Sequence, residues 1–458
     1  MDDPDRIKEL FELKVPEHAA RFVVYSPKIT PRLQYCCRFI FNHVLKVQCF
    51  LTDSETMFAE SSDYRINYSY QQIPDVFRIK PHQLTTEDIM LQRRPEPFFR
   101  DNQIYFFPNT ETEAGLDFDL FSAVFYFISR HEEWQDFEPD RHNRFDAPQS
   151  ILYSRQFHNK PVVDQWILEF NLALRRLYPG LKFPEKKFRI ISTIDVDNVY
   201  AYRHKGFVRT AGAIFRDLLK LDISATSERL SVFCGWKKDP FDIYEDVSRF
   251  CNQNGIPLFW FFLLRSGQRY DRAIDHSRPE LKKLLNELSE VSEVGLHPSY
   301  ESSTNGKIME EDLRRFSDIT GENPGFSRQH YLRFDIRSTP GQLSDAGVKA
   351  DFTMGFAGNT GFRAGTSHPF YYFDFKNNRQ GALLFVPFCL MDGVFTYYNP
   401  TDSKTALVNM LALAAEIKNT GGNFISVFHE RTFSDRLYRG YGSLYKKLHL
   451  KLVELQGR

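Results

Sequence analysis

Acidic and basic side chains stand at the ends of several apolar runs in the second half of the chain. One run ends in Thr193-Ile194-Asp195-Val196-Asp197, and another ends in Gly295-Leu296-His297-Pro298. Later runs end in Ser327-Arg328-Gln329-His330-Tyr331 and in Ser426-Val427-Phe428-His429-Glu430. Packing alone does not place carboxylates, imidazoles and a guanidinium at corresponding ends of successive runs. We therefore interpret these residues as candidates for one functional site.

These residue types are the components of a metal-assisted hydrolase. Asp195 and Asp197 are separated by one residue, so on a strand both carboxylates face the same side. Like charges at that spacing favour a cation beside them. A divalent metal held by carboxylate and imidazole activates water and polarises a carbonyl, while a separate base and acid move the protons. Taken singly, each residue also fits a plainer role as a helix cap, a turn residue or part of a salt-bridged loop.

The candidate residues lie in a region where short apolar runs alternate with helical patterns. Continuously apolar runs separated by helices are typical of a parallel sheet covered by helices. In barrels of this kind the chemistry gathers at the C-terminal ends of the strands. We therefore predict an α/β fold with a (β/α) barrel of about seven strands. The expected strands are 188–197, 257–265, 293–297, 325–331, 349–356, 383–390 and 424–429, and the expected helices include 211–220, 243–254, 280–289, 310–320, 404–419 and 444–455.

The part of the chain before Pro184 has a mixed pattern. Residues 21–26 and 103–107 are predicted strands, and 119–130 is a predicted helix with apolar residues at helical spacing. The pattern changes near Pro179-Gly180, which indicates a domain boundary. We expect a smaller α/β N-terminal domain of unknown role over 1–184 and the barrel over 185–458.

Composition narrows the class of function. The 458 residues include 59 Lys and Arg against 59 Asp and Glu, and this neutral balance argues against nucleic-acid binding. No apolar run reaches the roughly 18 residues of a transmembrane helix. The N-terminus is polar and does not read as a secretory signal, and the six cysteines show neither a CxxC pair nor metal-site spacing. We therefore expect a reduced, cytoplasmic protein.

From Phe188 to the C-terminus the motifs resemble those of the polysaccharide deacetylases, the NodB homology domain of carbohydrate esterase family 4. The resemblance implies a distorted (β/α) barrel that removes N- or O-acetyl groups from glycans with Zn²⁺ or a similar divalent ion. Asp195-Val196-Asp197 is similar to the first motif, which implies that Asp195 is the base and Asp197 a metal ligand. The segment from Glu293 to Pro298 resembles the start of the second motif, which implies that His297 is a metal ligand.

The second motif departs from the family pattern four residues after His297. Glu301 stands where the family has a second metal-binding His. Three alternatives follow: Glu301 supplies a carboxylate ligand, His330 supplies the missing imidazole, or the metal site is weak or absent.

The remaining motifs imply further roles. Arg328 resembles the Arg that orients the base, Asp351 the Asp that tunes the acid, and His429 the general acid. Aromatic residues make up 15% of the chain, and most of them suit buried strands, whereas a few fall on loops near the expected mouth of the barrel. Such rings can cover the apolar faces of a sugar, and a guanidinium can grip a polar substituent. The expected substrate-binding residues are Tyr300, Tyr331, Arg363 and Tyr371.

The expected function is metal-dependent deacetylation of an acetylated sugar or glycan. Bacterial intracellular members of the family with a similar layout carry an extra N-terminal domain, and residues 129–145 look like a segment of it. Because the N-terminus does not read as an export signal, we expect an intracellular substrate, such as a nucleotide sugar or a lipid-linked precursor of a surface polysaccharide. The alternative is a catalytically degenerate barrel that binds glycans or acts as a scaffold in polysaccharide biosynthesis.

Overall fold

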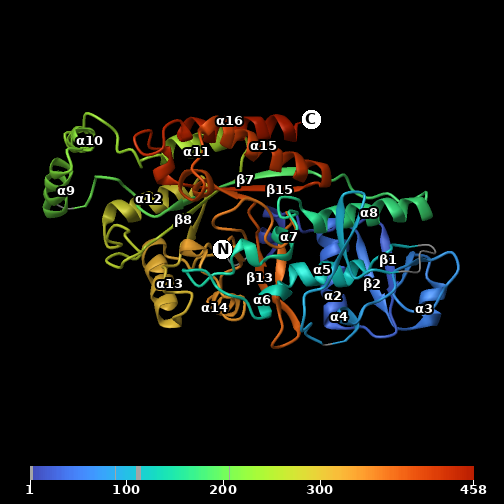
Figure 1. Cartoon of the computed structure of the whole chain (residues 1–458). Coiled ribbons are helices and arrows are strands. Elements are labelled where there is room, and N and C mark those ends of the chain that lie inside the picture. The colour runs from blue at the N-terminus through green and yellow to red at the C-terminus, as the bar shows by residue number, and fades with distance from the viewer. Residues whose placement is uncertain (1–3, 88, 110–114, 206, 458) are drawn as a thin grey trace. The chain divides into compact units, whose positions relative to one another are not determined.

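A computed structural model describes residues 4–87, 89–109, 115–205 and 207–457 of the chain (Figure 1). These residues form two compact units that are discontinuous in sequence. The first comprises Met1–Arg189, Phe334–Cys389 and Leu413–Phe424, and the second comprises Ile190–Arg333, Leu390–Ala412 and Ile425–Arg458. The first unit thus combines the N-terminal 189 residues with two later segments of the chain.

The first unit has two sheets that lie in its N-terminal part. Four short parallel strands take the order β2-β1-β3-β4, and β5 and β6 form an antiparallel hairpin. A third group of strands, from later in the chain, takes the order β12-β13-β11. The elements are α1 (Pro4–Leu10), β1 (Arg21–Tyr25), α2 (Pro31–Cys37), the π-helix η1 (Arg38–Val44), β2 (Gln48–Thr52), α3 (Glu55–Glu60), β3 (Tyr64–Asn67), β4 (Phe77–Arg78), α4 (Gln83–Thr86), β5 (Pro97–Arg100), β6 (Gln103–Phe106), α5 (Leu120–Ile128), α6 (His131–Trp134), the 3₁₀ turn η2 (Ala147–Gln149), α7 (Ile151–Ser154), α8 (Val162–Leu177), α14 (Thr339–Asp345), β11 (Ala350–Asp351), β12 (Phe370–Asp374) and β13 (Arg379–Phe385).

The second unit contains the strands that end on the candidate residues. Their order is β10-β9-β8-β7-β15-β14, and β7, β8, β9 and β10 pair in parallel. The elements that lie wholly or mainly in this unit are β7 (Phe188–Val196), α9 (Phe207–Leu219), α10 (Ile223–Phe233), α11 (Tyr244–Gln253), β8 (Leu258–Phe262), α12 (Pro279–Ser289), β9 (Glu293–Leu296), α13 (Gly306–Thr320), β10 (Phe326–Ser327), η3 (His330–Leu332), β14 (Leu390–Met391), the π-helix η4 (Val394–Tyr398), α15 (Ser403–Thr420), β15 (Gly422–His429), η5 (Glu430–Phe433) and α16 (Tyr441–Gln456).

A helix contact and close strand packing hold the parallel strands of the second unit in place. Tyr445 of α16 bonds through its hydroxyl to Ser192 of β7 at 2.7 Å. Gly295 lets β9 approach its neighbours, because a Cβ there would lie 2.7 Å from the Phe326 carbonyl oxygen and 2.8 Å from the Phe261 ring. Bulky apolar residues fill the strands themselves, and every residue of β8 is buried. Three parallel strands are thus packed closely enough to bring their C-terminal ends together.

The number of strands differs from the predicted seven. The described residues after 185 form nine strands, β7 to β15. The run 383–390 covers two separate strands, β13 and β14, because the chain leaves the ladder after Phe385 and pairs again at Leu390. Strand β12 was not expected, and it pairs antiparallel with β13 across a turn at 375–378. Tyr371 therefore lies in a strand and not in a loop.

The helices between strands lie close to their predicted positions. Helix α10 was missed, since its Ser and Thr residues obscure the apolar period. Across the ranges that the structure describes, no helix is both long enough and apolar enough to span a bilayer.

Candidate active site with a metal-ligand group

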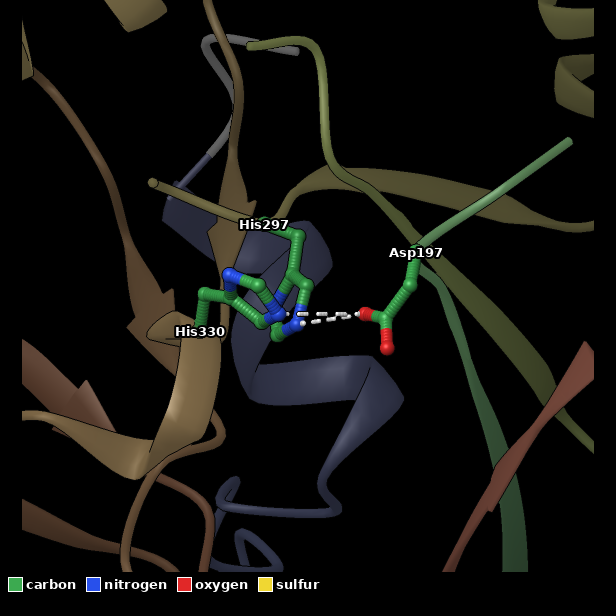
Figure 2. Close-up of side chains that lie close together, drawn as sticks. All are labelled: Asp197, His297 and His330. Carbon is green, nitrogen blue, oxygen red and sulfur yellow. Dashed lines mark ion pairs between the residues drawn. The ribbon is translucent and has the colours of Figure 1, made fainter. Parts of the chain in front are cut away.

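Three side chains that follow different strands meet in the interior of the second unit. Asp197 follows β7, His297 follows β9 and His330 opens the η3 turn after β10. Asp197 Oδ1 lies 3.6 Å from His297 Nε2 and 3.5 Å from His330 Nε2, and all three residues are buried. Figure 2 shows both rings directing a nitrogen at the same carboxylate oxygen. Ligand atoms of the three residues lie within 4.8 Å of one another, a spacing that can hold a metal ion.

The second nitrogen of each imidazole has a partner that fixes its proton. His297 Nδ1 lies 2.5 Å from the backbone oxygen of Arg328, which can only accept a hydrogen bond. His330 Nδ1 lies 2.8 Å from Asp271 Oδ1. In the neutral rings the proton is therefore on Nδ1, and the lone pair is on the Nε2 that faces Asp197. A carboxylate or carbonyl behind the ring is the usual arrangement around a metal-binding His.

Asp197 is the acidic member of this group. Burial opposes its ionisation, but nearby positive charge, above all the Arg431 guanidinium, outweighs burial and holds the pKa of Asp197 well below its usual range. Its Oδ2 is 2.5 Å from Arg431 Nη1. Its Oδ1 is buried and has no hydrogen-bond partner among the described residues. An unpartnered carboxylate oxygen opposite two imidazole lone pairs fits a divalent cation with nitrogen and oxygen ligands, such as Zn²⁺.

A second carboxylate lies beside the group and is held by a buried guanidinium. Arg328 Nη1 donates to Asp195 Oδ1 at 2.7 Å and to Thr193 Oγ1 at 2.8 Å. Asp195 Oδ2 is 4.0 Å from His297 Nε2. Arg328 is fully buried and Asp195 nearly so. This pairing leaves one oxygen of Asp195 on the side of the imidazole and fixes the orientation of the carboxylate.

His429, at the end of β15, is paired with a buried carboxylate. Its Nδ1 lies 2.7 Å from Asp392 Oδ1, and its backbone N–H donates to Asp392 Oδ2 at 2.7 Å. The Thr432 hydroxyl also donates to Asp392. Burial disfavours the imidazolium, but the Asp392 charge outweighs burial and raises the pKa of His429 to about 9. The ring is therefore a proton donor at neutral pH.

The loop after β7 is fixed by Glu430. Its carboxylate accepts from the backbone N–H of Asp197 at 3.1 Å and of Asn198 at 3.2 Å. Burial and the neighbouring Asp197 charge raise the pKa of Glu430 to about 7. The Asp197 backbone is thus anchored by the residue that follows His429.

Three tyrosines form an aromatic cluster next to His330. Tyr270 stacks on Tyr300 with ring centroids 4.1 Å apart, and Tyr331 meets both rings edge-on. Tyr300 is buried, whereas Tyr331 is 37% exposed. The backbone of Tyr331 is in the left-handed region at a φ of 59°, which is unusual for a residue with a bulky side chain. Tyr331 therefore offers a ring to solvent beside the ligand group.

Two expected site residues lie apart from these contacts. The Glu301 side chain is 53% exposed, and its nearest printed partner is Arg333 at 3.5 Å, so the structure places His330 and not Glu301 with Asp197 and His297. Asp351 is buried in the first unit, where its Oδ1 accepts from the Thr353 backbone N–H at 2.9 Å. The carboxylate bonded to His429 is Asp392, not Asp351.

The other two expected substrate contacts are also in the first unit. Arg363 is 2% exposed, and its Nε and Nη2 donate to the two oxygens of Glu133 at 2.8 Å and 2.7 Å. The guanidinium is thus engaged in the interior and is not offered to a ligand. Tyr371 lies on β12 with its ring against His43. The roles of both residues in substrate binding stay predictions.

Three residues of the site were missed by sequence reasoning. Asp392 follows β14 directly, and extending the apolar run by two residues would have found it by the strand-end rule. Arg431 lies two residues beyond His429 and was interpreted only as part of a charged loop. Asp271 lies in a long irregular segment between β8 and α12, and no local pattern marks it.

Comparison with known proteins gives one family match and several structural likenesses. A family of unknown function (DUF7033) matches residues 22–179, which is 158 of the 458 residues. No curated protein sequence matches the chain.

Three solved structures resemble parts of the chain. A candidate polysaccharide deacetylase from Mycobacterium smegmatis is 15% identical, with a TM-score of 0.40, over 60% of this chain and 86% of that one. The Xyl-CE4 domain of a multidomain xylanase from the hindgut metagenome of Trinervitermes trinervoides is 12% identical, with a TM-score of 0.28, over 59% and 82%. IcaB from Ammonifex degensii is 12% identical, with a TM-score of 0.22, over 38% and 85%.

Proposed function

We propose that this chain is a metal-dependent hydrolase that removes an N- or O-acetyl group from a carbohydrate. The observation that carries the proposal is the arrangement of two proton-transfer pairs around one ligand group. Asp195, held by Arg328, lies beside His297. His429, paired with Asp392, directly precedes Glu430, whose carboxylate accepts from the backbone N–H of Asp197. A site that only binds a glycan does not require both a held base and a protonated acid on the elements that carry its ligand group.

Asp197, His297 and His330 are the residues that would hold the metal, with Zn²⁺ as the proposed ion. When bound, such an ion polarises the acetyl carbonyl and lowers the pKa of a water molecule. The Nδ1 partners of the two histidines keep their Nε2 atoms available for it.

The remaining residues move the protons. Asp195, oriented by Arg328, takes a proton from the attacking water as a C–O bond forms to the acetyl carbon. The bond between that carbon and the sugar nitrogen or oxygen breaks, and His429 gives its proton to the leaving group. The products are acetate and a free amine or hydroxyl. The exposed ring of Tyr331 would cover a face of the sugar.

The test is acetate release from a panel of N- and O-acetylated oligosaccharides by the zinc-loaded protein. Asp195→Asn keeps the shape of the base and should abolish release, while Asp402→Asn removes a carboxylate exposed on the protein surface and should not. Release that is equal in the Asp195→Asn variant would contradict the assigned base. A zinc-loaded protein that binds glycans but releases no acetate across the panel would favour the glycan-binding alternative.

A further inference from the structure

The second unit contains a cavity of about 540 Å³ next to the group formed by Asp197, His297 and His330 in the sequence sense: the residue after Asp197 lines it. Asn198 lines it, and Asn198 follows Asp197 directly, so their Cα atoms are about 3.8 Å apart. The volume lies in the range of small-molecule sites. The cations on its wall are Lys205, Arg216, Arg229, Arg272 and Arg278.

The wall of this cavity carries an excess of positive charge. Among the lining residues there are five Lys and Arg side chains and one carboxylate, that of Asp275. Asp217, behind the lining, pairs with Arg229 at 2.8 Å and with Arg216 at 3.5 Å. Lys and Arg side chains thus outnumber carboxylates among the lining residues. The whole chain has a net charge of zero, so this concentration of charge is local.

We propose that this cavity binds a phosphate or pyrophosphate group attached to the acetylated sugar. The proposal rests on the proposed function, because it assigns the substrate class of the same site. A single carboxylate substituent carries one negative charge, whereas phosphate groups carry up to two and present several acceptor oxygens. Arginines bind such oxygens in pairs of parallel hydrogen bonds. The cavity would thus hold the anionic end of the substrate while the acetyl group lies at Asp197.

Binding of inorganic pyrophosphate to the zinc-free protein tests the cavity without requiring activity. Isothermal titration at low and high salt should show salt-dependent binding that Arg216→Gln/Arg272→Gln weakens by about tenfold or more. The matched control Arg249→Gln/Arg314→Gln removes two cations elsewhere in the unit and should leave the affinity unchanged. Equal weakening in both double variants, or tighter binding of glucuronate than of pyrophosphate, would overturn the proposal. Since no acetyl substrate is present, either outcome is independent of the deacetylase assignment.

A separate feature of the same unit is an apolar surface on α9, α10 and the turn that follows. Figure 1 shows α9 and α10 side by side at the edge of the second unit, and the two helices contact one another. Eight large apolar side chains here are between 44% and 84% exposed, which is far more than isolated surface residues require. They are Phe215, Leu218, Leu219, Leu221, Ile223, Leu230, Phe233 and Trp236.

The charges around this apolar surface are mainly positive. Residues 210–238 contain five Lys and Arg against three Asp and Glu. Lys220, Lys237 and Lys238 are exposed next to the apolar side chains, and Trp236 is 80% exposed beside the last two lysines. Helices with apolar side chains bordered by lysine and tryptophan are suited to the interface of an anionic bilayer.

We infer that the α9–α10 surface docks on an anionic membrane. Vesicle sedimentation should then show the protein bound to mixed phosphatidylglycerol and phosphatidylcholine vesicles and not to pure phosphatidylcholine. Leu219→Ser/Phe233→Ser/Trp236→Ser should abolish this binding, whereas Val408→Ser, at an apolar residue of similar exposure on α15, should not. Undiminished vesicle binding by the triple variant would overturn the inference. It would also be overturned if the protein did not bind vesicles but formed a dimer, and the triple variant lost that dimer.

The two experiments together distinguish two sources of the phosphate. A lipid-linked substrate predicts both pyrophosphate binding and vesicle binding. A water-soluble sugar phosphate predicts pyrophosphate binding with no contribution from the α9–α10 surface.

Discussion

Replacing Asp392 by Asn should move the alkaline limit of activity to lower pH. The Asp392 carboxylate bonds to His429 at 2.7 Å and is the group that raises the pKa of the ring against the effect of burial. Asn keeps the size of the side chain and an acceptor oxygen but removes the charge. The protonated ring, which is the proposed acid, then loses the interaction that favours it.

The size of the effect follows from the pKa of His429. With a pKa of about 9 the ring is protonated at neutral pH and loses its proton as the pH rises through that value. Without the Asp392 charge, burial and the Arg431 guanidinium lower the pKa by more than Asp197 raises it, so the pKa should not exceed the ordinary value of about 6.5. At about pH 7.5 only about one ring in ten would then be protonated, so kcat/KM should fall about tenfold. The difference in kcat/KM between the variant and the unchanged protein should become smaller as the pH is lowered towards 6.

The assay is the pH dependence of acetate release by the zinc-loaded protein. Thr432→Val is the matched control, because it removes a hydrogen bond to Asp392 and keeps the charge. The alkaline limb of that control should stay near its original position, although its rate falls slightly. A limb that stays in place in Asp392→Asn, or a loss that is the same at every pH, would refute the assignment of His429 as an acid tuned by Asp392.

The remaining predictions concern metal affinity and stability. Asp271→Asn should weaken zinc affinity by about ten- to a hundredfold, because it removes the carboxylate that holds His330. Competition with a chelator measures the affinity, and an unchanged value would contradict the prediction. Arg328→Met should lower the free energy of unfolding by about 3–5 kcal/mol, because Asp195 loses a buried partner. Urea unfolding at neutral pH measures the change, and an unchanged free energy of unfolding would count against the buried Arg328–Asp195 pair. Arg363→Met should destabilise the chain by a similar amount without changing the KM for substrate, and a raised KM with normal stability would restore a role in substrate binding.

The alternation of apolar runs and helical patterns was enough to predict the parallel strands of the second unit. Strands β7, β8 and β9 lie within the expected ranges, and β15 begins two residues before its range, because buried parallel strands are apolar on both faces. The β12–β13 hairpin was missed because Phe370 to Phe373 lacks the alternation of a half-buried strand, and most of it is buried. The division into two units was beyond local pattern, since segments 334–389 and 413–424 join the first unit through contacts distant in sequence.

The sequence identified those residues of the candidate site that lie at the ends of strands. Asp195, Asp197, His297, His330, Arg328 and His429 all lie in the contacts of one unit. The choice between Glu301 and His330 depends on how the loops after β9 and β10 turn, and residue spacing does not contain that information. Asp271 likewise reaches His330 from a loop that has no periodic pattern.

Zinc binding by matched ligand variants tests the central claim most directly. Equilibrium dialysis of the purified protein, with metal content read by mass spectrometry, should give one zinc ion per chain. His330→Ala should lose the ion, whereas Glu301→Ala should retain it, because only His330 shares contacts with Asp197 and His297. Zinc that persists in His330→Ala and disappears in Glu301→Ala would contradict the proposed ligand group.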